Sequence, residues 1–365
     1  MRTIRRLVYG EVLLAVGFVT VGFLGLFFFF DFVDELRDIG KGEAGGYQLA
    51  HALSYVALLV PSHLYELLPI TVLIGTIFVM ARLAQSSEYT ILRTSGLGPW
   101  RALRTLLAMG LGFVLLTFLV GDYVAPWSDR TAQLLKVRFQ GRITVGQTGA
   151  WLKEKRQYSA YANVGALTSD GSMRGVRIYE FDGSGTLAVQ TQAERASFAG
   201  DAWELHDVTR TEYRVAAEPA RVEHHQLPSL RWQTDITPEM VSAALLKPER
   251  MGTIDLFQYV RHLDANGQSA LRYEIQFWRK VFYPLSCLVM VVLALPFAYL
   301  HFRSGGITGY VFGGVMAGIS FFLLNNVFGY IGNLGNWLPW LTAAAPGLIY
   351  SALSLAAFGW LVLRR

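Results

Sequence analysis

Six long apolar segments alternate with polar stretches along this chain. Residues 12–30, 67–81, 105–121, 281–300, 304–336 and 337–363 carry no Asp, Glu, Lys or Arg. A transmembrane helix needs about 20 mostly apolar residues, and the second segment reaches this length if it extends back to about residue 57. The last two segments meet at GNLGNWLPW, whose Gly, Asn and Pro residues indicate a turn. The pattern therefore predicts six membrane-spanning helices.

Basic residues cluster at alternate ends of these segments, whereas DFVDELRDIGKGE after the first segment is rich in acids. Lys and Arg concentrate in the cytoplasmic loops of membrane proteins, so we expect both termini and the 82–104 loop in the cytoplasm. The basic start is similar to a signal peptide, but its apolar run continues through FLGLFFFFDF without a small-residue cleavage site, and we expect an anchor. The basic residues are Arg2, Arg5, Arg6, Arg82, Arg93, Arg101, Arg104, Arg303, Arg364 and Arg365.

The composition changes sharply between the third and fourth segments. Residues 123–275 are polar, and turn signals such as TSDGSM and FDGSGT separate short runs such as GVRIYEF and TLAVQTQ that alternate apolar and polar positions. This alternation is typical of half-buried strands and predicts a small β-sandwich or open β-roll on the extracytoplasmic side. The expected domains are transmembrane helices 1–3 in 1–125, a β-domain in 126–250, a helical connector in 251–275, and transmembrane helices 4–6 in 276–365.

Composition supports the membrane class and excludes several others. The chain of 365 residues is 53% hydrophobic and 16% charged, where soluble domains are nearer a quarter charged. The net charge of +5 reflects topology and does not indicate nucleic-acid binding. The single cysteine, Cys287, lies in an apolar segment and cannot form an intramolecular disulfide.

The residues needed for catalysis or for metal and nucleotide binding are not grouped in recognisable motifs. IGKGE lacks the first glycine and the Ser or Thr of a phosphate loop, and HLYEL, from His63, lacks zinc-protease spacing. His206, His224 and His225 are scattered through predicted β-structure. We therefore expect no catalytic residues, no metal and no cofactor in this chain.

Glycines recur four residues apart in the fifth apolar segment. Gly305, Gly309 and Gly313 form one series, and Gly314 and Gly318 repeat the spacing. Small residues on one face let membrane helices approach closely. The stripe either packs within the chain or provides a seam along which a partner helix slides, as a gate would require.

Charged residues gather at the outer ends of the segments. The bases there either extend to the interface from buried stems, as Lys and Arg commonly do, or together bind a phosphorylated lipid head group. The group comprises Asp31, Asp34, Glu35, Arg37, Lys41, Lys136, Arg138, Arg142, Arg272, Arg279 and Lys280.

A short amphipathic segment lies in the second loop, in AQSSEYTILRTSG. Ser86 or Ser87 can cap a helix, Glu88 falls in its first turn, and Gly96 can end it. A helix of this length is marginal alone, so we expect it near 86–96, held either by a partner protein or by the lipid surface.

Four features resemble the LptF/LptG family of lipopolysaccharide-export permeases. They are FVDELRDIG after the first segment, LLPITVLIGTIFVMARLAQSSEYTILRTSG through the second, GDYVAPWSDR after the third, and a β-domain followed by three spans. The resemblance covers essentially the whole chain. FVD.L...G and LAQ.SE are closer to the LptG branch, whereas APWSDR slightly favours LptF.

The resemblance implies a half-transporter without enzymatic activity of its own, in the inner membrane of a Gram-negative bacterium. Members pair as an LptF–LptG heterodimer on an LptB ATPase dimer, which uses ATP and Mg²⁺, with the single-span protein LptC attached. They extract lipopolysaccharide from the outer leaflet and pass it across periplasmic β-jellyroll domains to a periplasmic bridge of the LptA type.

The resemblance also assigns candidate site residues. The family's short cytoplasmic helix sits in a groove of the ATPase, which corresponds to Ser87, Glu88, Tyr89, Ile91, Leu92 and Arg93. Relatives carry a basic residue before FVD for head-group contact, whereas this chain has Asp31. Lipid contact there must therefore fall to Arg37, Lys41 or other bases such as Lys136, Arg138, Arg272 and Lys280, or to a divalent cation that bridges acid and phosphate.

Two functions from other classes compete with this interpretation. A membrane-anchored assembly or sensor protein would bind a periplasmic ligand with its β-domain and would need no helix docked to an ATPase. A membrane-embedded lipid-modifying enzyme would need a catalytic constellation that the sequence does not offer.

Overall fold

The computed structural model describes residues 2–40, 47–86, 98–140, 150–155, 159–168, 171–214, 221–238, 240–241, 248–299 and 307–360. The chain divides into two compact units. The helical unit comprises Met1–Asp34, Val56–Ser128 and Glu274–Arg365, and the β-unit comprises Glu35–Tyr55 and Asp129–Tyr273.

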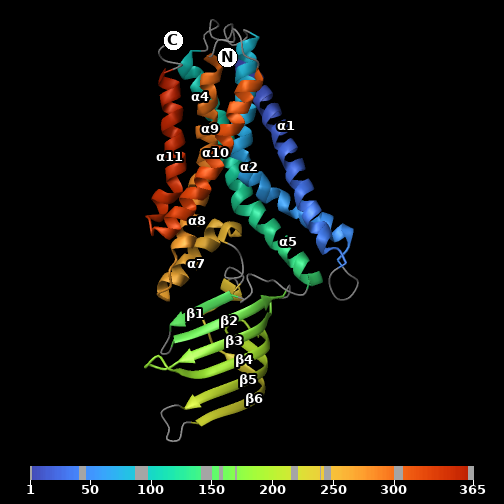
Figure 1. Cartoon of the computed structure of the whole chain (residues 1–365), viewed down its shortest axis with the longest axis vertical. Helices are drawn as coiled ribbons and strands as arrows, with labels where there is room; N and C mark the ends of the chain where they lie inside the picture. Colours follow the sequence, from blue (N-terminus) through green and yellow to red (C-terminus); the bar gives the residue numbers. More distant parts are fainter. Residues whose placement is uncertain are drawn as a thin grey trace. The chain divides into compact units, whose positions relative to one another are not determined.

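Among the residues that the structure describes, six helical stretches are long and apolar enough to cross a membrane, as the sequence pattern predicts. They are built from α1 (Arg2–Glu35), α2 (Leu49–Gln85), α4 (Pro99–Leu119), the π-helix η2 (Val120–Val124), α5 (Ala125–Gln140), α8 (Leu271–Phe282), η4 (Tyr283–Leu285), α9 (Ser286–Ala294), η5 (Leu295–Tyr299), α10 (Ile307–Leu334) and α11 (Pro339–Phe358). The turn predicted at GNLGNWLPW separates α10 from α11 (Figure 1).

Helix α2 is the centre of the helical unit. Its most apolar window is 83% buried, whereas the corresponding windows of α1 and α10 are each only 22% buried. One cluster joins α1, α2, α4, α9 and α11 through side chains such as Val12, Phe113 and Phe358, and a second joins α2, α9, α10 and α11 around Phe321. The exposed apolar faces of α1 and α10 are therefore free for lipid or for another protein.

Pro61 lies inside α2, and a hydroxyl group of α5 donates a hydrogen bond to the turn before it. Proline has no N–H and disturbs the hydrogen bonds of the preceding turn. The carbonyl oxygen of Leu58 accepts a hydrogen bond from Ser128 Oγ of α5 at 2.5 Å. The carbonyl that loses its backbone donor at Pro61 is that of Ala57, four residues earlier, so the Ser128 hydroxyl binds the adjacent carbonyl of the same disturbed turn.

The second proline of α2, Pro69, has an equivalent partner. Here the carbonyl oxygen of Glu66, three residues earlier, accepts a hydrogen bond from the Tyr283 hydroxyl at 2.5 Å. At both prolines of α2, a side chain from a later part of the chain therefore binds the carbonyl three residues earlier.

The third span is longer than the sequence pattern predicts. The apolar run ends at Gly121, but the helix continues through η2 and α5 to Gln140. Pro126 lies in the first turn of α5, where it cannot supply an N–H to the preceding turn. The backbone forms a π-turn here, in which the N–H of Ala125 donates a hydrogen bond to Val120 O five residues earlier. The helix is thus widened rather than ended.

The described residues of the β-unit form a six-stranded antiparallel sheet with strands in the order β1-β2-β3-β4-β5-β6, which confirms an inserted β-domain. Each strand pairs with its neighbours in sequence, and the sheet is strongly curved (Figure 1). The strands are β1 (Ala150–Lys155), β2 (Ser159–Leu167), β3 (Met173–Phe181), β4 (Leu187–Phe198), β5 (Trp203–Arg214) and β6 (Arg221–Trp232).

A tight turn at the predicted FDGSGT signal joins β3 and β4. Gly185 adopts a φ of 80° between β3 and β4, a conformation that suits glycine. Asp182 caps the same turn, because its Oδ1 accepts hydrogen bonds from the backbone N–H groups of Ser184 and Thr186, both at 2.9 Å. The hydrogen bond from the Ser184 hydroxyl lowers the pKa of Asp182 below its ordinary value, and the backbone donors add to this effect.

One face of the sheet is buried. Val176, Ile178 and Leu205 are almost completely inaccessible, and the indole N–H of the buried Trp203 donates to Ile236 O at 2.7 Å. The segment after β6 continues into η3 (Pro248–Arg250) and α7 (Thr253–Ala265), so that part of the predicted connector is helical.

Candidate lipid-handling site

Lys136 of α5 lies in an ionic cluster within the β-unit. Its Nζ is 3.0 Å from Glu35 Oε2 and 3.1 Å from Asp38 Oδ2. The Tyr55 ring centroid lies 4.8 Å from the same Nζ. The Glu35 side chain is only 7% exposed, so Lys136 chiefly neutralises a buried acid. Burial, followed by the nearby Glu35, raises the pKa of Tyr47 well above its ordinary value, which keeps this phenol neutral.

Asp31 contacts a histidine that the sequence pattern did not pair with it. Asp31 Oδ2 and His63 Nε2 lie 2.6 Å apart, between α1 and α2. The ring of Phe27 lies beside that of His63, with centroids 5.0 Å apart. The departure from the family pattern at Asp31 therefore coincides with an internal polar contact of this chain.

Lys280 of α8 is directed into the helical unit. It is 9% exposed, and its Nζ donates a hydrogen bond to Gly121 O in the π-helix at 2.9 Å. The Tyr65 ring centroid lies 6.0 Å from the ammonium group. Gly121 O is the acceptor that Pro126 leaves without a backbone donor in the π-turn, so Lys280 replaces a missing N–H.

The other predicted bases occupy varied settings. Arg272 pairs with Glu249 at 3.4 Å and is 58% exposed, and Arg279 donates to Asn326 Oδ1 at 3.3 Å. Arg37 is exposed in η1 (Leu36–Asp38) and has an interaction partner. Arg138 belongs to α5, while Lys41 and Arg142 lie outside the described residues.

The two glycine series of α10 face different surroundings. A β-carbon on Gly314 or Gly318 would lie 2.8 Å from a side-chain carbon of α2, so this series packs within the chain. A β-carbon on Gly309 or Gly313 would meet no atom within 4 Å. These two positions remain available to a partner helix, and Gly305 lies outside the described residues.

The predicted ATPase-coupling segment also lies outside the described residues, with Ser87, Glu88, Tyr89, Ile91, Leu92 and Arg93. The helix ends that flank it are described. Arg82 near the end of α2 pairs with Glu11 of α1 at 2.6 Å, and the ring of Trp100 at the start of α4 packs on Phe358 of α11. The start of α1, the end of α2, the start of α4 and the end of α11 therefore lie at one end of the helical unit (Figure 1).

The arrangement favours the handling of an amphiphile. Large apolar side chains remain exposed along α1, among them Leu14, Phe18 and Val21, and charged residues lie near its C-terminal end. Within the described residues, no three His, Cys, Asp or Glu side chains are grouped so that they could hold a metal ion. Residues that sequence reasoning missed are His63, Tyr65 and Gly121; the signal for Gly121 was Pro126, five residues later.

Comparison with known proteins gives one consistent result. The family model "Lipopolysaccharide export system permease LptF/LptG" matches residues 6–363. The chain is 28% identical to the lipopolysaccharide export system permease protein LptG of Escherichia coli K12 over 338 residues, which cover 92% of this chain and 90% of that protein. It is 26% identical to the LptG protein of Haemophilus influenzae over 369 residues, which cover 100% of this chain and 99% of that protein. The six apolar spans with an inserted β-sheet and the match along almost the whole sequence agree, and the chain belongs to the LptF/LptG family of lipopolysaccharide export system permeases.

Proposed function

We propose that this chain is a permease subunit, of the LptG type, in an ATP-driven transporter that extracts lipopolysaccharide from the inner membrane and passes it to a periplasmic bridge. The family match over residues 6–363 carries the proposal. It includes both halves of the helical unit and the inserted sheet, so the transport fold is matched as a whole.

In the proposed orientation, both termini and residues 87–97 face the cytoplasm and the sheet faces the periplasm. The bases near both termini and around 82–104 support it, because Lys and Arg favour the cytoplasmic side. The contact between Arg82 and Glu11 and that between Trp100 and Phe358 support it further, since they join the helix ends concerned.

The lipid path in this proposal follows the exposed face of α1 and, at its outer end, Arg37 and Lys41. Anionic head groups are attracted to bases at the membrane surface. Lys136 and Lys280 are less exposed than Arg37 and serve the permease internally, where they bind oxygen atoms of this chain. Replacing Lys41 by Glu should thus weaken crosslinking to lipopolysaccharide. Replacing Lys280 should instead lower the stability of the permease.

The partners in this proposal are an LptF-like permease, an LptB-like ATPase dimer with ATP and Mg²⁺, an LptC-like single-span protein and an LptA-like bridge. The exposed Gly309 and Gly313 face of α10 is available for close approach by the second permease. The segment with Glu88 and Leu92 supplies the contact with the ATPase, since helix-in-groove binding relies on apolar anchors and a charged contact.

The decisive experiment is purification from native membranes in mild detergent, followed by reconstitution in liposomes. We expect the chain to retain a nucleotide-binding subunit and a second permease, and to release lipopolysaccharide to a soluble acceptor only with ATP. Recovery without any ATPase would instead favour the membrane-anchored assembly or sensor protein.

A matched pair of variants tests the coupling segment. Glu88→Ala should lower the yield of the ATPase complex, because a partly buried charged contact contributes roughly 2–5 kcal/mol. Glu194→Ala removes an exposed carboxylate from β4 and should leave the yield unchanged. Normal complexes and transport in both Glu88→Ala and Leu92→Ala would show that coupling lies elsewhere.

A further inference from the structure

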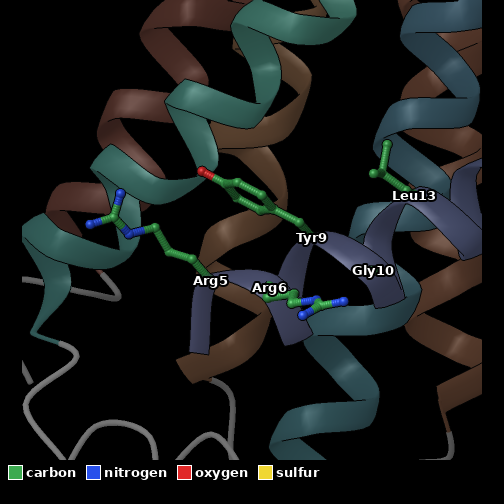
Figure 2. Close-up of a pocket in the computed structure, with 5 residues that line it drawn as sticks. All are labelled: Arg5, Arg6, Tyr9, Gly10 and Leu13. Carbon is green, nitrogen blue, oxygen red and sulfur yellow. The ribbon is translucent and has the colours of Figure 1, made fainter. Parts of the chain in front are cut away.

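The first turns of α1 border a cleft that carries two arginines (Figure 2). The cleft has a volume of about 700 Å³, within the range of pockets that hold small molecules. Figure 2 shows Arg5 and Tyr9 extending to one side of α1 and Arg6 extending the other way, towards Gly10. The lining residues are Arg5, Arg6, Tyr9, Gly10 and Leu13.

Gly10 forms the hollow. A β-carbon at this position would meet no atom within 4 Å, so the space above the helix backbone is open. A second cleft of about 360 Å³ shares Arg6 and Gly10 with the first and adds Leu7, Glu11 and Leu14. The two clefts therefore meet over Gly10.

The charge of this hollow is positive. Arg5 and Arg6 make no hydrogen bond or ion pair with any other residue that the structure describes. Glu11, the acid of the second cleft, is already paired with Arg82 at 2.6 Å. The two guanidinium groups are therefore available to an anion.

The hollow changes from polar to apolar along the helix axis. The Tyr9 hydroxyl donates to Thr105 O of α4 at 3.0 Å, which fixes the ring as one wall. Leu13 and Leu14 follow, 54% and 74% exposed, at the start of the uncharged run of α1. A ligand that fits both ends has an anionic head and a hydrocarbon tail.

We propose that the cleft at Arg5, Arg6 and Gly10 binds the phosphate head group of an anionic membrane phospholipid, with an acyl chain lying along α1 beyond Leu13. Arginine binds phosphate through charge-assisted hydrogen bonds, and basic pockets beside membrane helices bind anionic head groups. The apolar end favours a lipid over free phosphate. This lipid site does not depend on the proposed transport function. The proposed orientation determines only that the bound lipid belongs to the cytoplasmic leaflet.

Native mass spectrometry of the full chain in detergent tests the site with two probes, phosphatidylglycerol and phosphatidylcholine. The unaltered chain should retain phosphatidylglycerol more tightly than phosphatidylcholine. Arg5→Gln/Arg6→Gln should lower the binding constant for phosphatidylglycerol roughly 10- to 30-fold, because each base near the membrane surface contributes to such binding.

A pair of glycine variants separates the hollow from general surface charge. Gly10→Leu keeps both arginines but fills the hollow, and it should lower phosphatidylglycerol binding by a similar factor without loss of thermal stability. Gly17→Leu lies two turns further along α1, also with no atom within 4 Å of a β-carbon, and should bind lipid like the parent.

Three results would overturn the proposal. They are unchanged phosphatidylglycerol binding in both the double-arginine variant and Gly10→Leu, equal retention of the two lipids by the parent, and displacement of the lipid by millimolar inorganic phosphate. Loss of a copurifying protein from Gly10→Leu with lipid binding intact would assign the hollow to a protein partner instead.

Discussion

The ammonium group of Lys280 donates a hydrogen bond to the carbonyl oxygen of Gly121, 2.9 Å away in the π-helix of the third span. Proline explains the acceptor, because Pro126 cannot donate back to this turn. In α2, the carbonyl oxygens of Leu58 and Glu66, each three residues before a proline, accept hydrogen bonds from Ser128 and Tyr283. The helical unit thus uses later side chains to satisfy carbonyl groups near its prolines.

Lys280→Met should destabilise the helical unit. The change leaves Gly121 O without its donor, and a hydrogen bond to a charged group contributes roughly 1.5–3 kcal/mol. The midpoint of thermal unfolding in detergent should fall measurably. Arg272→Met is the control, because this exposed arginine has only a surface partner, Glu249, and should change stability by less than about 0.5 kcal/mol. Equal midpoints for both variants would contradict the role assigned to Lys280.

Ser128→Ala should cost roughly 1 kcal/mol, since it removes the donor to Leu58 O. Pro61→Ala restores only the backbone N–H that bonds to Ala57 O, four residues earlier, so Ser128→Ala should cost much the same in this background. A double-mutant cycle on unfolding in detergent measures the two costs. Unchanged stability in Ser128→Ala would contradict the role assigned to the hydroxyl.

Lys136→Met should destabilise the β-unit by roughly 2–4 kcal/mol, because it leaves Glu35 buried without a counter-charge. This loss of stability is smaller than that expected for breaking a fully buried ion pair, because the Lys136 side chain is 27% exposed. Adding Glu35→Leu should recover much of the loss. Chemical denaturation of the single and double variants provides the measurement, and a double variant as unstable as Lys136→Met would refute the pairing.

Gly318→Ala should lower stability by roughly 1–3 kcal/mol, because the new β-carbon would lie 2.8 Å from Ile70 Cγ2, close to the backbone of α2. Gly314→Ala should cost less, since its contact is the terminal Cδ1 of Ile77, which can move. Gly313→Ala should be neutral or slightly stabilising in the isolated chain. Thermal unfolding ranks the three variants, and a different order would refute the assigned packing.

Stability should fall as the pH is lowered from 7.5 to 5.5, in part through His262 of α7. Burial lowers the pKa of His262 below its ordinary value of 6.5. The unfolded chain therefore binds a proton there at a higher pH than the folded chain, so stability is lost as the pH falls through this window. His262→Gln should flatten the profile, whereas His225→Gln, at an exposed position on β6, should not. A slope that survives in His262→Gln would exclude this origin.

The spans and the hairpins were predictable because their signals are local. Uncharged runs identify the spans, and turn glycines such as Gly185, which takes a positive φ, separate the strands. The partners of the charged residues were not predictable, because they are distant in sequence. Lys280 has the pattern of a base at the interface, yet its acceptor is 159 residues away, and Asp31 lies 32 residues from His63. Sequence spacing gives no measure of such distances in space.

The hydrogen bonds near Pro61 and Pro69 of α2 also impose an order on the biogenesis of the protein. A nascent chain presents α2 to the membrane before Ser128 and Tyr283 have been synthesised, since chains are made from the N-terminus. Until those residues arrive, the carbonyl groups of Leu58 and Glu66 lack their side-chain donors, and the turns before Pro61 and Pro69 have fewer hydrogen bonds than in the finished protein. The second helix therefore reaches its final state only after the fourth span has been made.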